Sequence, residues 1–218
     1  MKKLTAEEIQ KNYEAFVKCC SLTLSPERYE KVKVMLDDLE DIMALAPASG
    51  KNWYHGAYAG GYIVHVLKVV KAAYKVRDLF KSMGGNIDFT DEELIFSALF
   101  HDLGKIGDVG KPNYLVQDSE WHRLNQGSEF KNNTDLDFML VPDRSLYLLQ
   151  KYGITVSQKE YLAIMLHDGM YEETNKPYLF SFNPGAKLKT NIVTVLHIAD
   201  HLAASSEFDQ EHCEYHEY

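Results

Sequence analysis

The chain has 218 residues, of which 45% are hydrophobic, and a formal net charge of −9. This length fits one domain with a short extension, and no apolar run reaches about eighteen residues, so we expect no transmembrane helix. Because proteins bind long nucleic acids mainly by neutralising phosphates, the acidic charge argues against such partners. The composition therefore predicts a globular protein that acts on small molecules away from the membrane.

The N-terminal part predicts two helices. A capping box at residues 5–8 (TAEE), in which threonine and glutamate side chains accept free backbone N–H groups, opens a helix to about residue 20. An N-cap serine followed by proline opens a second helix over 26–45. We interpret residues 1–46 as a helical extension packed on a core domain that covers residues 47–204.

Glycines and a second capping box divide the middle of the chain. A glycine-bearing loop ends at Gly60-Gly61, Gly84-Gly85 stops the following helix, and the sequence TDEE at residues 90–93 opens the next one. The resulting order is a long helix over 61–83, a helix over 91–102, a loop to about 117 and a short helix around 121–122.

The C-terminal part predicts two further helices before the last one. One begins near residue 143 and ends at Gly153, and a third capping box at 157–160 (SQKE) opens the next, which leads to His167. Residues 170–188 are predicted to be a loop with a short extended piece at 178–182. The last strong helix is expected over 188–204, followed by a flexible acidic tail at 205–218. β-alternation is otherwise missing, so the sequence predicts an all-α fold.

Three apolar helices each carry side chains that bind metals. His65 interrupts the apolar stretch GYIVHVL, His101 and Asp102 end the stretch IFSALF, and Asp200 lies in LHIAD. Burying such groups without partners costs several kcal/mol, although a single histidine of this kind is often only hydrogen-bonded in a core. Imidazole and carboxylate groups that converge from several helices are typical of a divalent cation site. One bound cation would explain all three interruptions.

The order of these residues, His65, His101-Asp102 and Asp200, forms the pattern H…HD…D, with the sequence FHDLGK around the central pair. By this motif, over about residues 50–204, the chain resembles the HD superfamily of metal-dependent phosphohydrolases. The resemblance implies an HD-domain helical bundle around a metal site and hydrolysis by metal-activated water. It also implies that these four residues bind a first divalent ion, whose identity stays open among Mn, Fe, Mg, Zn, Ni and Co.

The resemblance implies roles for two further histidines. In dinuclear HD proteins, two histidines lie between the HD pair and the last aspartate, which here correspond to His122 and His167. They would bind a second ion, with Asp102 bridging. In mononuclear nucleotidases such histidines instead contact substrate or protonate a leaving group. The number of ions, one or two, therefore stays open, and we assign Asp102, His122 and His167 catalytic as well as metal-binding roles.

Lys105 is the predicted contact to the phosphate. It lies three residues after Asp102 and follows a flexible glycine, so its ammonium can lean toward a phosphate held at the metal. The alternative is a lysine at a helix C-terminus that only favours the helix dipole. We assign Lys105 to both catalysis and substrate binding.

The loop before His65 predicts a binding cleft. It looks like the glycine-bearing loop of HD phosphodiesterases and HD-type 3′-5′ exoribonucleases, and its Tyr54, His55 and Tyr58 could stack on a base. Further candidates for contacts to an anionic substrate follow in the chain, each with the alternative of an ordinary solvated charge: Arg123, Lys131 and Arg144.

These features together predict a metal-dependent phosphohydrolase, a nucleotidase or phosphodiesterase, that acts on a nucleotide or small phosphodiester. One alternative is a di-iron oxygenase, because some HD proteins with six ligands activate dioxygen. Another is a non-catalytic HD module that binds a nucleotide. The N-terminal helices could form a homodimer interface or a lid, and the sequence leaves this open.

Cysteine use and the N-terminal sequence predict the compartment. The three cysteines, Cys19, Cys20 and Cys213, are an odd number without metal-ligand spacing, so reduced thiols are expected. The N-terminal residues become acidic at once and lack an apolar signal core. We therefore expect a cytoplasmic protein.

Overall fold

The computed structural model describes residues 3–181 and 183–212. This part of the chain is predominantly α-helical, as predicted, and none of its helices is long and apolar enough to cross a membrane. The α-helices in chain order are α1 (Ala6–Thr23), α2 (Pro26–Leu45), α3 (Gly61–Ser82), α4 (Asp91–Phe100), α5 (Glu120–Gln126), α6 (Val141–Lys151), α7 (Gln158–Leu166), α8 (Lys176–Leu179) and α9 (Ile192–His212).

The helix starts follow the capping signals in the sequence. Thr5, Thr90 and Ser157 each accept the backbone N–H three residues ahead, and the glutamate at that position accepts the N–H of the cap residue. Helix α2 begins at Pro26, although the Ser25 side chain caps no backbone N–H of this helix. Local sequence therefore determines where these four helices begin.

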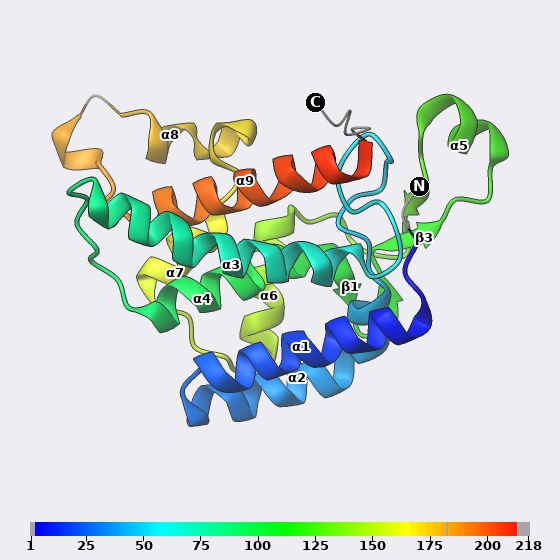
Figure 1. The fold of residues 1–218 in the computed structure, drawn as a ribbon, viewed down its shortest axis with the longest axis horizontal. Coiled ribbons are helices and arrows are strands. Elements are labelled where there is room, and N and C mark those ends of the chain that lie inside the picture. Colours follow the sequence, from blue (N-terminus) through cyan, green and yellow to red (C-terminus); the bar gives the residue numbers. More distant parts are fainter. Residues whose placement is uncertain (1–2, 182, 213–218) are drawn as a thin grey trace, which may run out of the picture.

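The bundle is organised around α3, which packs most extensively against α9. Figure 1 shows α3 crossing the middle of the molecule with α9 above it and the pair α1 and α2 below it, while α4, α6 and α7 lie behind. One hydrophobic core connects these helices, and its fully buried members include Phe16, Leu39, Val66, Leu99 and Leu196. The helix that carries His65 therefore lies at the centre of the fold.

The N-terminal helices are part of the same core. The ring of Phe16 in α1 meets the edge of Phe100 in α4 at a centroid distance of 6.3 Å. The hydroxyl of Tyr13 donates a 2.9 Å hydrogen bond to the carbonyl oxygen of Leu36 in α2. Residues 1–46 thus pack directly behind the helix that ends at His101.

Two short hairpins occupy regions that the sequence presented as loop. Strands β1 (Gly107–Asp108) and β2 (Lys111–Pro112) pair antiparallel, as do β3 (Tyr114–Val116) and β4 (Phe130–Asn132). Such short strands lack the alternation that predicts a strand, so sequence reasoning missed them. Segment 114–132, called the arm below, runs out along β3, turns through α5 and returns along β4 (Figure 1).

The segment between α7 and α9 differs from the prediction. It contains the 3-10 turns η2 (Gly169–Tyr171), η3 (Glu173–Asn175) and η4 (Pro184–Ala186). The predicted extended piece at 178–182 is wrong, because helix α8 begins at Lys176 and includes its first half, while residue 182 lies outside the described residues.

Helix α9 is longer than predicted. It continues to His212, so residues 205–212 of the predicted flexible tail are helical, and residues 213–218 lie outside the described residues. Glu207, in this added part, is buried. A buried contact can stabilise the end of a helix whose polar composition predicts fraying.

The two cysteines in the described residues are free thiols on α1. Burial raises the pKa of the thiol in both Cys19 and Cys20, so both stay protonated near neutral pH. Cys213 lies outside the described residues.

Candidate metal centre

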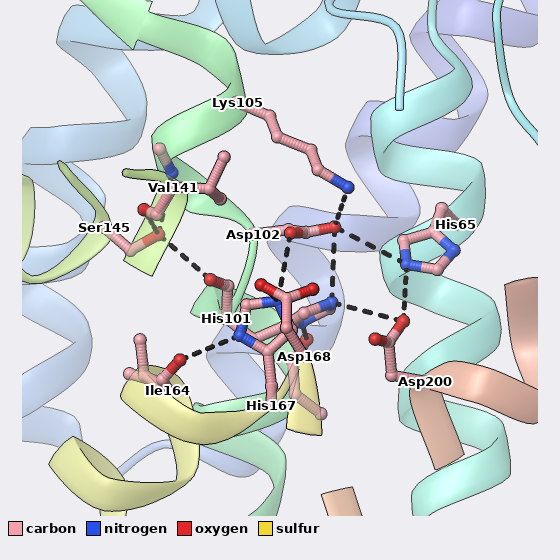
Figure 2. Close-up of polar contacts among 12 residues, drawn as sticks. His65, His101, Asp102, Lys105, Val141, Ser145, Ile164, His167, Asp168 and Asp200 are labelled. Carbon is pink, nitrogen blue, oxygen red and sulfur yellow. Dashed lines mark hydrogen bonds and ion pairs between the residues drawn. The ribbon is translucent and has the colours of Figure 1, made fainter. Parts of the chain in front are cut away.

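Four helices bring a buried cluster of histidine and aspartate side chains together (Figure 2). His65 comes from the second turn of α3, near its N-terminal end, and Asp200 comes from α9, which packs beside α3. His101 is the C-cap of α4 and His167 the C-cap of α7, so the ends of two apolar helices deliver their imidazoles to the same point. Asp102 follows His101 and completes the cluster, which we call the His/Asp cluster: His65, His101, Asp102, His167 and Asp200.

The distances within the His/Asp cluster suit a common ligand. His65 Nε2 lies 3.0 Å from Asp200 Oδ1 and 3.6 Å from Asp102 Oδ2. His101 Nε2 lies 3.4 Å from Asp102 Oδ2 and 3.7 Å from Asp200 Oδ1. His167 Nε2 faces the other oxygen of Asp102, at 3.4 Å. The carboxylate of Asp102 therefore has one oxygen on each side of the cluster.

Hydrogen bonds on the far side of each imidazole leave Nε2 available for a ligand. His101 Nδ1 donates to the carbonyl oxygen of Ala98 at 2.9 Å, and His167 Nδ1 donates to that of Ile164 at 2.8 Å. His65 Nδ1 faces Glu207 Oε2 at 2.8 Å. An acceptor at Nδ1 places the proton there, so in each neutral ring Nε2 carries a lone pair.

The buried Nε2 atoms of His65 and His101 have no hydrogen-bond partner of acceptable geometry among the described residues. Both nevertheless face the carboxylate oxygens of Asp102 and Asp200. Lone pairs that face anionic oxygens in a buried space repel one another unless a cation lies between them. Nitrogen and oxygen donors of this kind suit a divalent transition metal, so the residues fit a bound ion.

The charges in the cluster are strongly coupled. Burial raises the pKa of Asp102, but Lys105 and His101 outweigh that effect and hold this pKa well below its usual range. Burial likewise opposes ionisation of Asp200, yet His101 and His65 keep its pKa well below the usual range. Burial lowers the pKa of His101, but Asp102 and Asp200 raise it to about 10. Both carboxylates are therefore ionised, and without an ion the cluster attracts protons as compensating charge.

Lys105 lies at the edge of the cluster. Its Nζ is 2.6 Å from Asp102 Oδ2, and 19% of its side chain remains exposed. Burial lowers the pKa of the Lys105 ammonium, but Asp102 outweighs this and raises the pKa above its usual range, so the group stays charged. Figure 2 shows the ammonium of Lys105 pointing toward Asp102, so the position combines a contact to the cluster with partial exposure to solvent.

A serine network fixes the turn that follows His101. The backbone N–H of Gly104 donates to Ser145 Oγ at 2.8 Å, and Ser145 Oγ lies 3.0 Å from the carbonyl oxygen of His101. Gly104 lies against α6 so closely that a Cβ there would collide with the carbonyl oxygen of Val141. The glycine of the sequence HDLGK is thus needed for close packing.

His122 lies apart from the His/Asp cluster. It is exposed on α5, where its Nδ1 lies 2.7 Å from Ser119 Oγ and its ring contacts Trp121. Helix α5 contains no buried residue, and the arm that carries it points away from the bundle (Figure 1). The structure does not bring His122 to the five other predicted ligands. The prediction was wrong for His122 because the order of residues in the chain carries no information about the direction of the arm.

Of the other residues predicted to contact substrate, some lie near the His/Asp cluster and others do not. His55 lies 4.5 Å from the His65 ring, centroid to centroid, and its Nε2 is buried. Tyr54 is exposed at the mouth of the same region, whereas Tyr58 is buried. Arg123 is exposed on α5, outside the cluster. Arg144 is buried and donates to the carbonyl oxygen of Asp137 at 2.7 Å, so it stabilises the α6 region and does not reach the cluster.

A cleft opens beside Lys105. It has a volume of about 540 Å³ and is bounded by the loop at 48–55 and by the base of the arm. Its lining includes three lysines and three aromatic side chains, namely Lys51, Lys105, Lys131, Tyr54, Tyr114 and Phe130. His55 also borders this cleft while its ring contacts His65, so it lies between the cluster and the cleft.

Sequence reasoning missed one supporting residue. Glu207, which accepts from His65, lies in a segment that its acidic composition presented as a flexible tail. His197 supports the cluster from the same helix as Asp200, because its Nδ1 donates to the carbonyl oxygen of His167 at 2.7 Å. It lies three residues before Asp200, and residues i and i+3 share a helix face.

Comparisons with known proteins leave the site to be interpreted from its own geometry. No protein-family model matches the chain, and neither the curated proteins nor the solved structures contain a match. The chain therefore stands as a helical bundle with a buried His/Asp cluster that can hold a metal ion.

Proposed function

We propose that this protein is a metal-dependent phosphohydrolase of the HD type that acts on a nucleotide or small phosphodiester. The observation that carries the proposal is the position of Lys105, whose ammonium contacts Asp102 and also borders the cleft. An ammonium group that contacts a metal-binding cluster and also borders an open cleft can bind an anionic group of a substrate that extends from the cleft to the cluster.

His65, His101, Asp102 and Asp200 would hold the ion, and His167 faces the second oxygen of Asp102. When bound, a divalent ion lowers the pKa of a coordinated water and stabilises negative charge on a phosphoryl oxygen. The buried Nδ1 bonds of His101 and His167 hold their rings in one orientation, so the cluster is organised before substrate arrives.

The cleft suits a phosphate attached to an aromatic base. Lys105 would hold a non-reacting phosphate oxygen near the cluster, while Lys51 and Lys131 would attract further negative charge. Tyr114 and Phe130, from paired strands at the base of the arm, offer ring faces on which a base can stack.

His55 is a candidate general base. Burial, together with nearby His65 and Lys105, lowers its pKa to about 3, so the ring is neutral in the free protein and can accept a proton. The residue borders the cleft and its ring contacts His65, so it could take a proton from a nucleophile that is activated beside the cluster.

The test combines metal content with turnover. Purified protein is reconstituted with Mn, Fe, Zn, Ni, Co or Mg, and metal content per chain and phosphate release from nucleoside mono-, di- and triphosphates and cyclic nucleotides are measured. Asp102→Ala should abolish both metal retention and turnover, because it removes a ligand and leaves Lys105 unpaired. The exposed Asp135→Ala serves as the matched control and should retain both.

Three outcomes would contradict the proposal. Full activity in Asp102→Ala would contradict the assignment of the His/Asp cluster as the active site. Iron-dependent consumption of dioxygen would favour the di-iron oxygenase alternative, and tight nucleotide binding without turnover across all metals would favour a non-catalytic module.

A further inference from the structure

Glu207 is a carboxylate in an unexpected place. It lies near the C-terminal end of α9 with 4% of its surface exposed, although this stretch of the helix is rich in polar residues. Burying a carboxylate costs free energy unless specific partners compensate for it. Its partner is His65 Nδ1, at 2.8 Å. The His55 ring nitrogen Nε2 lies 4.0 Å from the same carboxylate oxygen, Oε2.

The next helical turn holds the loop that borders the cleft. Glu211 accepts the backbone N–H of Gly56 at 3.0 Å, and His212 Nε2 lies 2.6 Å from the carbonyl oxygen of Asn52. The backbone N–H of Asn52 in turn donates to the carbonyl oxygen of Gly127 in the arm, at 2.8 Å. One end of α9 thus contacts a cluster histidine and the wall of the cleft.

We propose that Glu207 and Glu211, in the last turns of α9 (residues 207–212, called the terminal turns), are positioning residues of the site. Glu207 orients the imidazole of His65 for metal binding, and Glu211 holds the loop that carries His55 in place. The inference rests on the metal centre of the proposed function, but not on the reaction performed there.

The physical reason is the two-sided chemistry of imidazole. A carboxylate that accepts the Nδ1 proton fixes the tautomer with its lone pair on Nε2, restrains rotation of the ring and increases the electron density offered to a metal. His65 is the one cluster histidine with a carboxylate in this role, since His101 and His167 use backbone carbonyl oxygens. Removing the carboxylate should therefore weaken His65 as a ligand.

Matched variants of the terminal turns test this role. Glu207→Ala removes the acceptor, and Glu207→Gln keeps an acceptor oxygen without the charge. Gln210→Ala changes a neighbouring residue whose side chain contacts the half-buried Lys68. The affinity for Co²⁺ is measured by competition with a chelator, and the visible spectrum of the bound ion reports its coordination. Folding is monitored by circular dichroism.

We expect Glu207→Ala to bind Co²⁺ about 10–100-fold more weakly and to change the spectrum. Glu207→Gln should recover part of the affinity, and Gln210→Ala should match the wild type. If Glu207→Ala fails to fold, the nearly isosteric Glu207→Gln carries the test alone. A purely structural role would lower thermal stability without changing the spectrum.

Glu211 is tested separately by amide hydrogen exchange. Glu211→Ala should accelerate exchange at Gly56 while Co²⁺ affinity stays at the wild-type value, and Glu211→Gln should restore protection. Unchanged protection at Gly56 would overturn this half of the inference.

The failures can be told apart. Wild-type protein that takes up no ion would overturn the metal centre and the inference together. Wild-type protein that binds Co²⁺ while both Glu207 variants bind equally well, with an unchanged spectrum, would overturn the positioning role and leave the metal centre intact.

Discussion

At the scale of single residues, the His/Asp cluster places imidazole and carboxylate groups inside an apolar core. His65, His101, Asp102 and Asp200 are polar interruptions of apolar stretches, so the cost of burying them singles them out. Glu207 lies in a polar stretch of sequence, where nothing distinguishes a buried carboxylate from an exposed one. His122 shows the opposite error, because its place in the chain order suggested a ligand while its side chain is exposed on α5.

Gly104 provides a prediction at this scale. A Cβ at this position would collide with the carbonyl oxygen of Val141, and the backbone between His101 and Lys105 would have to move. Gly104→Ala should therefore lower the free energy of unfolding by about 1–3 kcal/mol, as overpacked substitutions do, and should reduce metal affinity. Urea denaturation and metal titration measure the two effects. Gly185→Ala, at an exposed glycine in the 3-10 turn η4, should change neither, and equal stability of the two variants would contradict this account.

At the scale of elements, the bundle is held together by pairs that local sequence does not reveal. Arg28 at the start of α2 makes a two-pronged ion pair with Glu160 of α7, with N–O distances of 2.7 and 2.6 Å. Its guanidinium also lies 3.6 Å from the centre of the Phe96 ring. This contact connects the N-terminal helices to the helix that ends at His167.

Loss of the arginine should be costly because Glu160 would stay buried without its charge partner. Arg28→Met should destabilise the protein by about 3–5 kcal/mol, and the double variant Arg28→Met/Glu160→Gln should lose less, since no buried charge is left alone. The exposed pair of Lys176 and Glu173 offers the control, where Lys176→Met should cost about 0–1 kcal/mol. Chemical denaturation measures all three, and a double variant as unstable as Arg28→Met would argue against the burial explanation.

The start of α9 provides a prediction about pH. Asp88 accepts the backbone N–H of Asn191 at 2.9 Å, just before the helix. Burial raises the pKa of Asp88, but the N–H of Asn191, the hydroxyl of Thr190 and the ammonium of Lys159 outweigh it, so the pKa lies below its usual value. The folded state therefore favours the ionised carboxyl.

Because the pKa is lowered on folding, this stabilisation is complete above the unfolded value near 4 and is lost as the pH falls through the folded value. The difference in unfolding free energy between wild type and Asp88→Asn should be largest above about pH 5 and shrink below about pH 4. Urea denaturation at a series of pH values measures it. A difference that stays constant from pH 3 to pH 7 would count against the carboxylate as its source.

At the scale of the whole molecule, the N-terminal helices and the bundle share one core. Four buried side chains of the α1 region pack into it: Tyr13, Phe16, Cys20 and Leu24. A large buried apolar side chain contributes roughly 1.5–3 kcal/mol, so their loss approaches the total stability of a typical domain, about 5–15 kcal/mol.

Deletion of residues 1–24 should therefore abolish cooperative unfolding, and not simply lower the melting temperature. Near-ultraviolet circular dichroism and thermal unfolding measure this, and Phe16→Ala should remain folded with a loss of about 3–5 kcal/mol. A truncated chain that unfolds cooperatively, with near-native stability, would show that residues 1–24 are separable from the rest.

The sequence by itself determined the helical class, the starts of four helices and the set of polar residues that must be explained inside apolar stretches. These depend on local chemistry, because a cap is made within one turn and the cost of burying a charge belongs to the residue that carries it. The tertiary structure decided which of these residues meet. Sequence order could not separate His167, at the end of a buried helix, from His122, on an arm that points outward, nor could it pair Glu207 with His65 across 142 residues. Such pairings depend on the packing of helices distant in the chain, and local sequence carries no record of it.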